Sequence, residues 1–72
     1  MQLRQWDKVV ADYTRAIELK PDEPSCYERR GTAYLQLTQY DKAIADYSKA
    51  IELDPKNDYY RQQRMRAQQK RN

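Results

Sequence analysis

Two stretches of the chain decide its fold: QWDKVVADYTRAIELKP at residues 5–21 and QYDKAIADYSKAIELDP at residues 39–55. They align without a gap at an offset of 34 residues, and 11 of the 17 aligned positions are identical. A period of this length is typical of stacked helix-turn-helix units, each of which needs its neighbours to bury its apolar face. The 72-residue chain is therefore predicted to be a small repeat protein.

Each stretch has the pattern of an amphipathic helix. Apolar side chains of the second stretch recur every three or four residues and so share one helical face. Pro21 and Pro55 end the two helices, because proline has no amide proton and restricts the residue before it. The predicted fold is all-α, an antiparallel helix-turn-helix solenoid of about four helices. Their expected ranges are 4–19, 24–37, 40–53 and 58–71.

Local signals mark the helix boundaries between the two stretches and after them. Pro24 suits a first helical position, and Asn57 is a good N-cap for the last helix. Thr38 followed by Asp41 resembles a capping box with a shortened acid. Gly31 lowers helix propensity, so its predicted purpose is to let a neighbouring helix approach closely.

The 34-residue unit resembles the tetratricopeptide-repeat (TPR) family. The residues that match the family's spacing are Tyr27, Gly31, Tyr34, Ala43, Tyr47, Ala50 and Pro55. The resemblance implies a short fragment that forms one TPR-like domain over 1–72. Within it, 1–23 is the second helix of a partial repeat, 24–57 is a complete repeat, and 58–72 is the first helix of a partial repeat or a polar cap.

The chain departs from the family pattern at a few positions. Arg30 stands where the family usually has leucine, so this part of the core is expected to be loose or to let the arginine reach solvent. Thr38 replaces the usual helix-ending glycine. In the last helix, polar or flexible residues take the places of Tyr27, Gly31 and Tyr34: Arg61, Met65 and Gln68.

The composition contains little that supports catalysis. There is no histidine and a single cysteine, Cys26, which has no partner for an internal disulfide. A reducing, cytoplasmic location is expected, and no apolar run is long enough to span a membrane. The aspartates at residues 7, 12, 41 and 46 are interpreted as solvated charges. We expect no enzyme activity, no cofactor and no metal site.

The resemblance implies a protein-protein interaction scaffold that binds a peptide or helix on a concave face lined by the first helices of the repeats. The expected peptide-binding residues are Glu28, Arg29, Thr32, Tyr59, Gln63 and Arg66. One TPR subclass clamps the carboxylate of chaperone tails with Lys, Asn and Arg. Those positions are not matched here, and Glu28 would repel a carboxylate.

Charge is unevenly distributed and leaves a second functional hypothesis open. Residues 1–58 hold 9 basic and 11 acidic side chains, a net charge of −2, whereas residues 59–72 hold 5 basic side chains and no acid. This basic segment, with Tyr59 and Tyr60, would suit nucleic acid. It would also suit an acidic protein, or simply keep a terminal helix soluble, and nucleic acid is the less favoured partner.

Self-association is a further expectation. The first helix lacks the partner helix of a full repeat, which leaves one side of four residues uncovered: Trp6, Val9, Val10 and Tyr13. Two copies of the chain would cover this side either as a closed two-fold dimer or by stacking head to tail. The closed dimer is slightly favoured.

Overall fold

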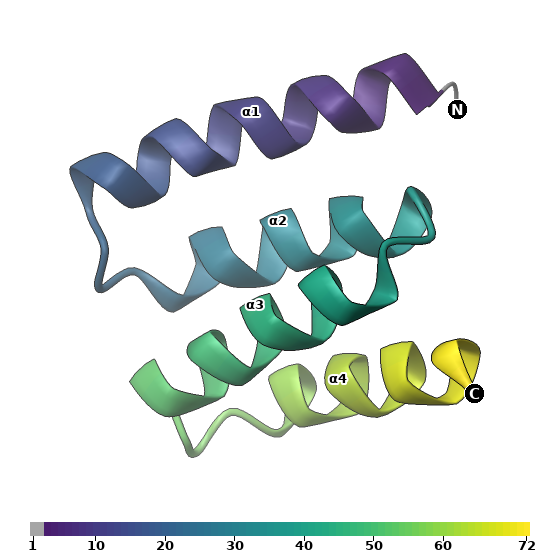
Figure 1. Ribbon diagram of the computed structural model, residues 1–72. Helices are drawn as coiled ribbons and strands as arrows, with labels where there is room; N and C mark the ends of the chain where they lie inside the picture. Colours follow the sequence, from purple (N-terminus) through teal and green to yellow (C-terminus); the bar gives the residue numbers. More distant parts are fainter. Residues whose placement is uncertain (1–2) are drawn as a thin grey trace.

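The computed structural model describes residues 3–72, and Figure 1 shows four helices laid side by side in chain order. Successive helices run antiparallel, and the two ends of the chain lie at the same end of the molecule. The described residues contain no strand, and the principal extents of 33 × 33 × 16 Å are those of a flat slab. The helices are α1 (Leu3–Leu19), α2 (Pro24–Gln36), α3 (Tyr40–Leu53) and α4 (Asp58–Arg71). The predicted all-α fold is confirmed, with helix limits that differ by one residue at most.

Each helix packs on its neighbours in the chain. The pairs α1–α2, α2–α3 and α3–α4 are in contact, and α2 also touches α4. This is the arrangement of a helical repeat, in which each unit contacts only the next. The sequence left open whether the last helix is docked. The structure docks it, because Tyr60 and Ala67 of α4 are buried.

The helix ends follow the local signals in two places of three. Pro24 occupies the first turn of α2, and the Asn57 side chain accepts a hydrogen bond of 3.0 Å from the Tyr59 amide at the start of α4. The capping box predicted at Thr38 is wrong. Gln39 is the N-cap of α3, without a side-chain capping bond, and the Thr38 hydroxyl donates to the Leu37 carbonyl instead.

Thr38 ends α2 in a left-handed backbone conformation, with φ of 59°. Its amide donates to the Leu35 carbonyl at 3.0 Å, and the Gln39 amide donates to the Tyr34 carbonyl at 2.9 Å. These two bonds form a Schellman motif, whose left-handed position is usually glycine because a Cβ is unfavourable there. Thr38, which stands where the family usually has glycine, therefore lies at a strained backbone position.

The core consists of two small clusters that join α2, α3 and α4. One contains Leu35, Ala43, Tyr47 and Ala67, and the other contains Tyr27, Ala50 and Tyr60. Tyr34 and Tyr40 pack as half-buried neighbours of the first cluster. Tyr60 is a core residue that the sequence did not single out.

Gly31 lies where α2 and α3 approach most closely. A Cβ added there would come within 3.0 Å of Tyr47 Cε1 and 3.2 Å of Asp46 Cβ. Ala43 and Ala50 on α3 are fully buried. The prediction that Gly31 lets a neighbouring helix approach closely is confirmed.

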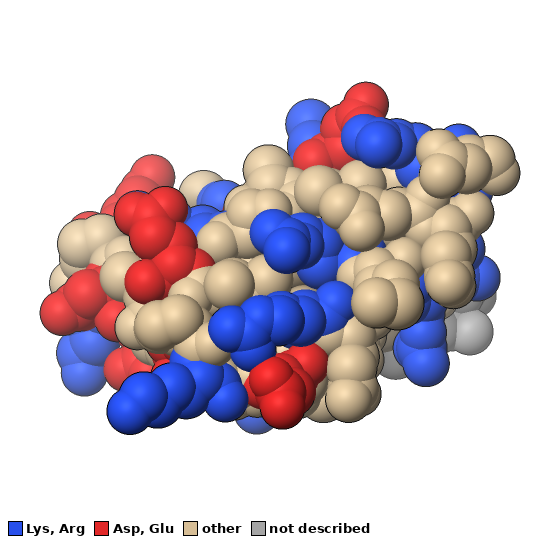
Figure 2. Space-filling view, turned by 90° about the horizontal axis from the view of Figure 1, so that it is seen from below, with Lys and Arg blue, Asp and Glu red and all other residues tan. Residues whose placement is uncertain are grey.

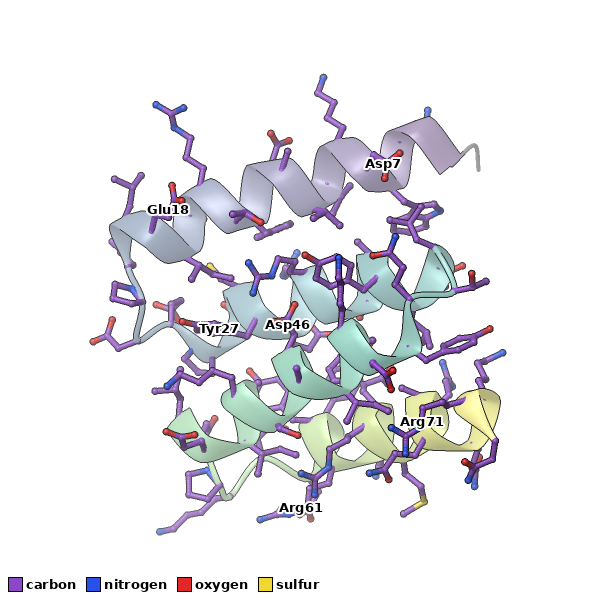
Figure 3. All side chains as sticks on the ribbon, viewed as in Figure 1. Asp7, Glu18, Tyr27, Asp46, Arg61 and Arg71 are labelled. Carbon is purple, nitrogen blue, oxygen red and sulfur yellow. The ribbon has the colours of Figure 1, made fainter. Side chains whose placement is uncertain are left out.

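Asp46 was interpreted as a solvated charge, and that interpretation is wrong. Its side chain is 7% exposed and lies between α2 and α3, where Figure 3 labels it. Arg30 Nε and Nη2 donate to its two carboxylate oxygens at 2.8 and 2.7 Å. Arg30 also donates to Thr14 on α1 at 3.2 Å, so one guanidinium ties three helices together. Its pKa is raised, first by the hydrogen bond to Asp46.

Candidate peptide-binding groove

A groove of about 440 Å³ opens beside α2, between α1 and α4. Because α2 contacts both α1 and α4, all three helices contribute walls to the groove. The lining residues are Trp6, Val9 and Tyr13 of α1, Glu28, Arg29 and Thr32 of α2, and Tyr59 of α4. Four of these seven side chains belong to the predicted peptide-binding set, and three belong to the predicted self-association set.

The groove therefore brings together two sets of residues that the sequence treated as separate sites. Of the peptide-binding set, Gln63 and Arg66 do not line it. Gln63 is half-buried on α4 and Arg66 is exposed. Of the self-association set, Val10 does not line it and is half-buried. The sequence had no signal for this merger, since the 34-residue alignment compares helices and says nothing about which ones face a common space.

A chain of hydroxyl groups fixes the carboxylate of Glu28 at the floor of the groove. The Thr32 hydroxyl shares its proton between Glu28 Oε2 at 3.0 Å and the Glu28 backbone carbonyl at 3.1 Å, and it lies 2.9 Å from the Tyr47 hydroxyl. Tyr47 is fully buried, and this burial raises its pKa. Because the single proton of the Thr32 hydroxyl is directed to Glu28, the Tyr47 hydroxyl donates the hydrogen bond between the two hydroxyl groups. The buried tyrosine thus orients the threonine, which orients the carboxylate.

Arg29 lies on the α1 side of the groove and is exposed. A hydrogen bond to the Tyr13 hydroxyl is the first cause of the raised pKa of its guanidinium. The groove consequently holds one negative and one positive side chain, which lie on adjacent residues of α2, together with three aromatic rings. These are the components of a site that fixes a ligand by a few polar contacts among apolar walls.

Figure 2 shows basic side chains interspersed with uncharged ones on the face seen from below, and three of the five basic side chains of α4 are already engaged. Arg61 pairs with Asp58 at 2.7 Å, Arg71 pairs with Asp41 at 3.0 Å, and Arg64 donates to Ser48 at 3.3 Å. Figure 3 shows Arg61 and Arg71 near opposite ends of this helix. Of the five basic side chains of α4, Arg66 and Lys70 have no such partner among the described residues.

A smaller hollow of about 300 Å³ lies at the turn between α2 and α3. Thr38, Asp41 and Arg71 are among the residues that line it. Its charged groups are largely satisfied by one another through the Arg71–Asp41 pair, so it offers less to a ligand than the groove does.

One face of α1 repeats the chemistry of a buried surface of α3. Val9, Asp12, Tyr13 and Ala16 align at the 34-residue offset with Ala43, Asp46, Tyr47 and Ala50, which are all buried. On α1, by contrast, Asp12 is exposed and the other three are half-buried. The partial exposure expected for Trp6, Val9, Val10 and Tyr13 agrees with their half-buried state.

The comparison with known families gives one match, over residues 24–57, to the family described as "Tetratricopeptide repeat". Residues 24–57 form a tetratricopeptide repeat. TPR repeats generally mediate protein-protein interaction and are typically non-catalytic scaffolds. A search of curated proteins finds no match to this TPR chain.

Two further findings concern residues 3–72 alone. These described residues contain no group of three or more histidine, cysteine or acidic side chains arranged to hold a metal ion. No helix in this part of the TPR chain is long and apolar enough to cross a membrane.

Proposed function

We propose that this TPR chain is a peptide-binding module, and that an extended peptide or a helix lies in the groove between α1, α2 and α4. The observation that supports this most is the groove itself, in which a carboxylate held by Thr32 and Tyr47 lies among three aromatic side chains. Glu28, Arg29, Thr32 and Tyr59 are the proposed contacts within it. Gln63 and Arg66 would extend the contact along α4.

The test uses Trp6, which lines the groove and is the single tryptophan of the chain. Peptides selected from a random library on the immobilised protein should change its fluorescence as they bind. Tyr59→Ala should weaken the selected peptides about tenfold, since aromatic side chains dominate the energetics of binding. Leu19→Ala is the matched control, because Leu19 is exposed and lies outside the groove. Equal affinities of the two variants would refute the assignment.

Nucleic-acid binding through α4 is the alternative from another class, and the side-chain partners argue against it. Three of its five basic residues are held by Asp58, Asp41 and Ser48 of the same chain. Releasing them for phosphate contacts would forfeit these interactions. A comparison of single-stranded RNA with an acidic peptide as ligands for α4 separates this alternative from a protein partner.

Self-association through α1 is retained as a proposal in its closed, two-fold form. The head-to-tail stack is less favourable, because Met65 of one copy would meet Tyr13 of the next copy in the way that Gly31 meets Tyr47 within the chain. The space beside Tyr47 is so narrow that even a Cβ at Gly31 would come within 3.0 Å of its ring, so a methionine would not fit at the equivalent place. Trp6 and Tyr13 would be covered in the dimer, so it would compete with a peptide. Sedimentation from micromolar to millimolar concentration should show a saturating dimer, and Trp6→Lys should abolish it. A monomer throughout would contradict the proposal.

A further inference from the structure

The carboxylate of Glu28 is oriented but has no cationic partner among the described residues. None of the four ion pairs in this part of the chain includes it. Oε2 accepts the Thr32 hydroxyl, whereas Oε1 accepts no hydrogen bond from the side chains that the structure describes, those of residues 5–72. Because Thr32 is held in turn by the fully buried Tyr47, the carboxylate is restrained before any ligand arrives. A restrained acceptor loses less entropy on binding than a mobile one.

Aromatic side chains surround this acceptor from two directions. Trp6 and Tyr13 line the groove from α1, and Tyr59, which is 50% exposed, lines it from α4. Aromatic faces attract ammonium and guanidinium groups. The same chemistry already occurs inside the chain, where the Arg30 guanidinium lies 5.9 Å from the ring centre of Tyr27 and 5.7 Å from that of Tyr34. Aromatic rings around a carboxylate are a favourable environment for a cation.

Arg29 is the charge that opposes this interpretation. It is exposed and lines the groove next to Glu28. An exposed arginine on a long flexible stem can turn into solvent when a cation enters. Glu28 cannot withdraw as easily from an acidic ligand, because Thr32 holds it. The difference in freedom between these adjacent residues favours a cationic ligand over an anionic one.

We propose that the groove selects peptides by a lysine or arginine side chain, whose cationic head pairs with Glu28 between the rings of α1 and Tyr59. This inference rests on the proposed peptide-binding function and names the chemistry of the ligand. Glu28 is then the residue that determines specificity, and Arg29 limits the affinity.

The experiment compares two opposite charge removals. Random peptides are selected on the wild-type chain, and one position of the bound peptides should be enriched in lysine or arginine. Replacing that residue by methionine should weaken binding roughly tenfold, the magnitude of one charge-assisted hydrogen bond. Glu28→Gln should cause a similar loss for the cationic peptides and almost none for their methionine versions. Arg29→Gln should raise the affinity for the cationic peptides, because it removes the positive charge next to Glu28.

Glu18→Gln serves as the matched control, since Glu18 is an exposed glutamate of α1 that does not line the groove. Circular dichroism of each variant checks that the helices are intact. Enrichment of acidic residues, or a loss on Arg29→Gln with none on Glu28→Gln, would overturn this inference while leaving peptide binding in place. Failure to select any peptide that alters Trp6 fluorescence would overturn both.

Discussion

Replacing Thr38 by glycine is expected to stabilise the fold. The residue adopts φ of 59°, in the left-handed region. This conformation costs a residue with a Cβ roughly 1–2 kcal/mol. Glycine removes that cost, but its more flexible unfolded chain offsets about 0.4–1 kcal/mol of the gain. The lost hydrogen bond from Thr38 to the Leu37 carbonyl is exposed and contributes little. The net gain is expected to be about 0.5–1 kcal/mol.

Thermal unfolding followed by circular dichroism measures this gain. For a domain of this size, 1 kcal/mol corresponds to roughly 4–8 °C, so Thr38→Gly should raise Tm by about 2–8 °C. Thr38→Ala is the matched control, because alanine keeps the Cβ and should shift Tm much less. A glycine variant that melts at or below the wild-type temperature would refute the argument that the Schellman motif stores strain at this residue.

Three further predictions concern the packing of α2 on α3. Gly31→Leu should cost roughly 1–3 kcal/mol by overpacking, because even a Cβ would reach 3.0 Å from Tyr47, and a wild-type melting temperature would contradict the assigned close approach. Arg30→Met should destabilise the fold more than Asp46→Ala, near the lower end of roughly 3–5 kcal/mol, because it leaves the 7% exposed Asp46 unpaired, whereas Arg30 is 19% exposed. In urea unfolding, the double variant should lose less stability than the two single variants together, and strict additivity would mean that the pair is not coupled. Burial raises the pKa of Tyr47, so the stability that its neutral form contributes is complete below pH about 10 and falls as pH rises through the folded-state pKa. Between neutral and strongly alkaline pH, the urea midpoint of Tyr47→Phe should therefore fall less than that of the wild type. Part of the fall should remain, because burial also raises the pKa of Tyr60.

The sequence was sufficient for the helices because its signals are local or periodic. Proline, asparagine and the spacing of apolar residues specify ends and faces without knowledge of the partner helix. The close approach at Gly31 was also predictable, since a glycine inside a helix costs stability and so indicates contact with another segment. The one local signal that failed was Thr38, because this residue ends α2 in a left-handed conformation and Gln39 occupies the N-cap of α3.

What the sequence did not predict depends on contacts between helices. Asp46 appeared solvated because its partner Arg30 is 16 residues away on another helix, and no pattern within one helix indicates that pairing. The groove likewise required the placement of α1 and α4 around α2. Glu28 was recognised as a candidate contact, but the hydroxyl chain that fixes it joins two helices through Tyr47 and leaves no mark in a single-helix pattern.

The hydrogen bonds of two arginines recur with the period of the chain. Arg30 donates to Thr14 at 3.2 Å, and Arg64, 34 residues later, donates to Ser48 at 3.3 Å. A duplicated copy of residues 24–57, inserted after Asn57, would supply every partner again: its own arginine would reach Ser48 of the preceding copy and the aspartate of its own second helix. Residues 24–57 thus form a unit from which longer arrays can be engineered, each added copy contributing one interhelical ion pair and one more interface to an additive stability.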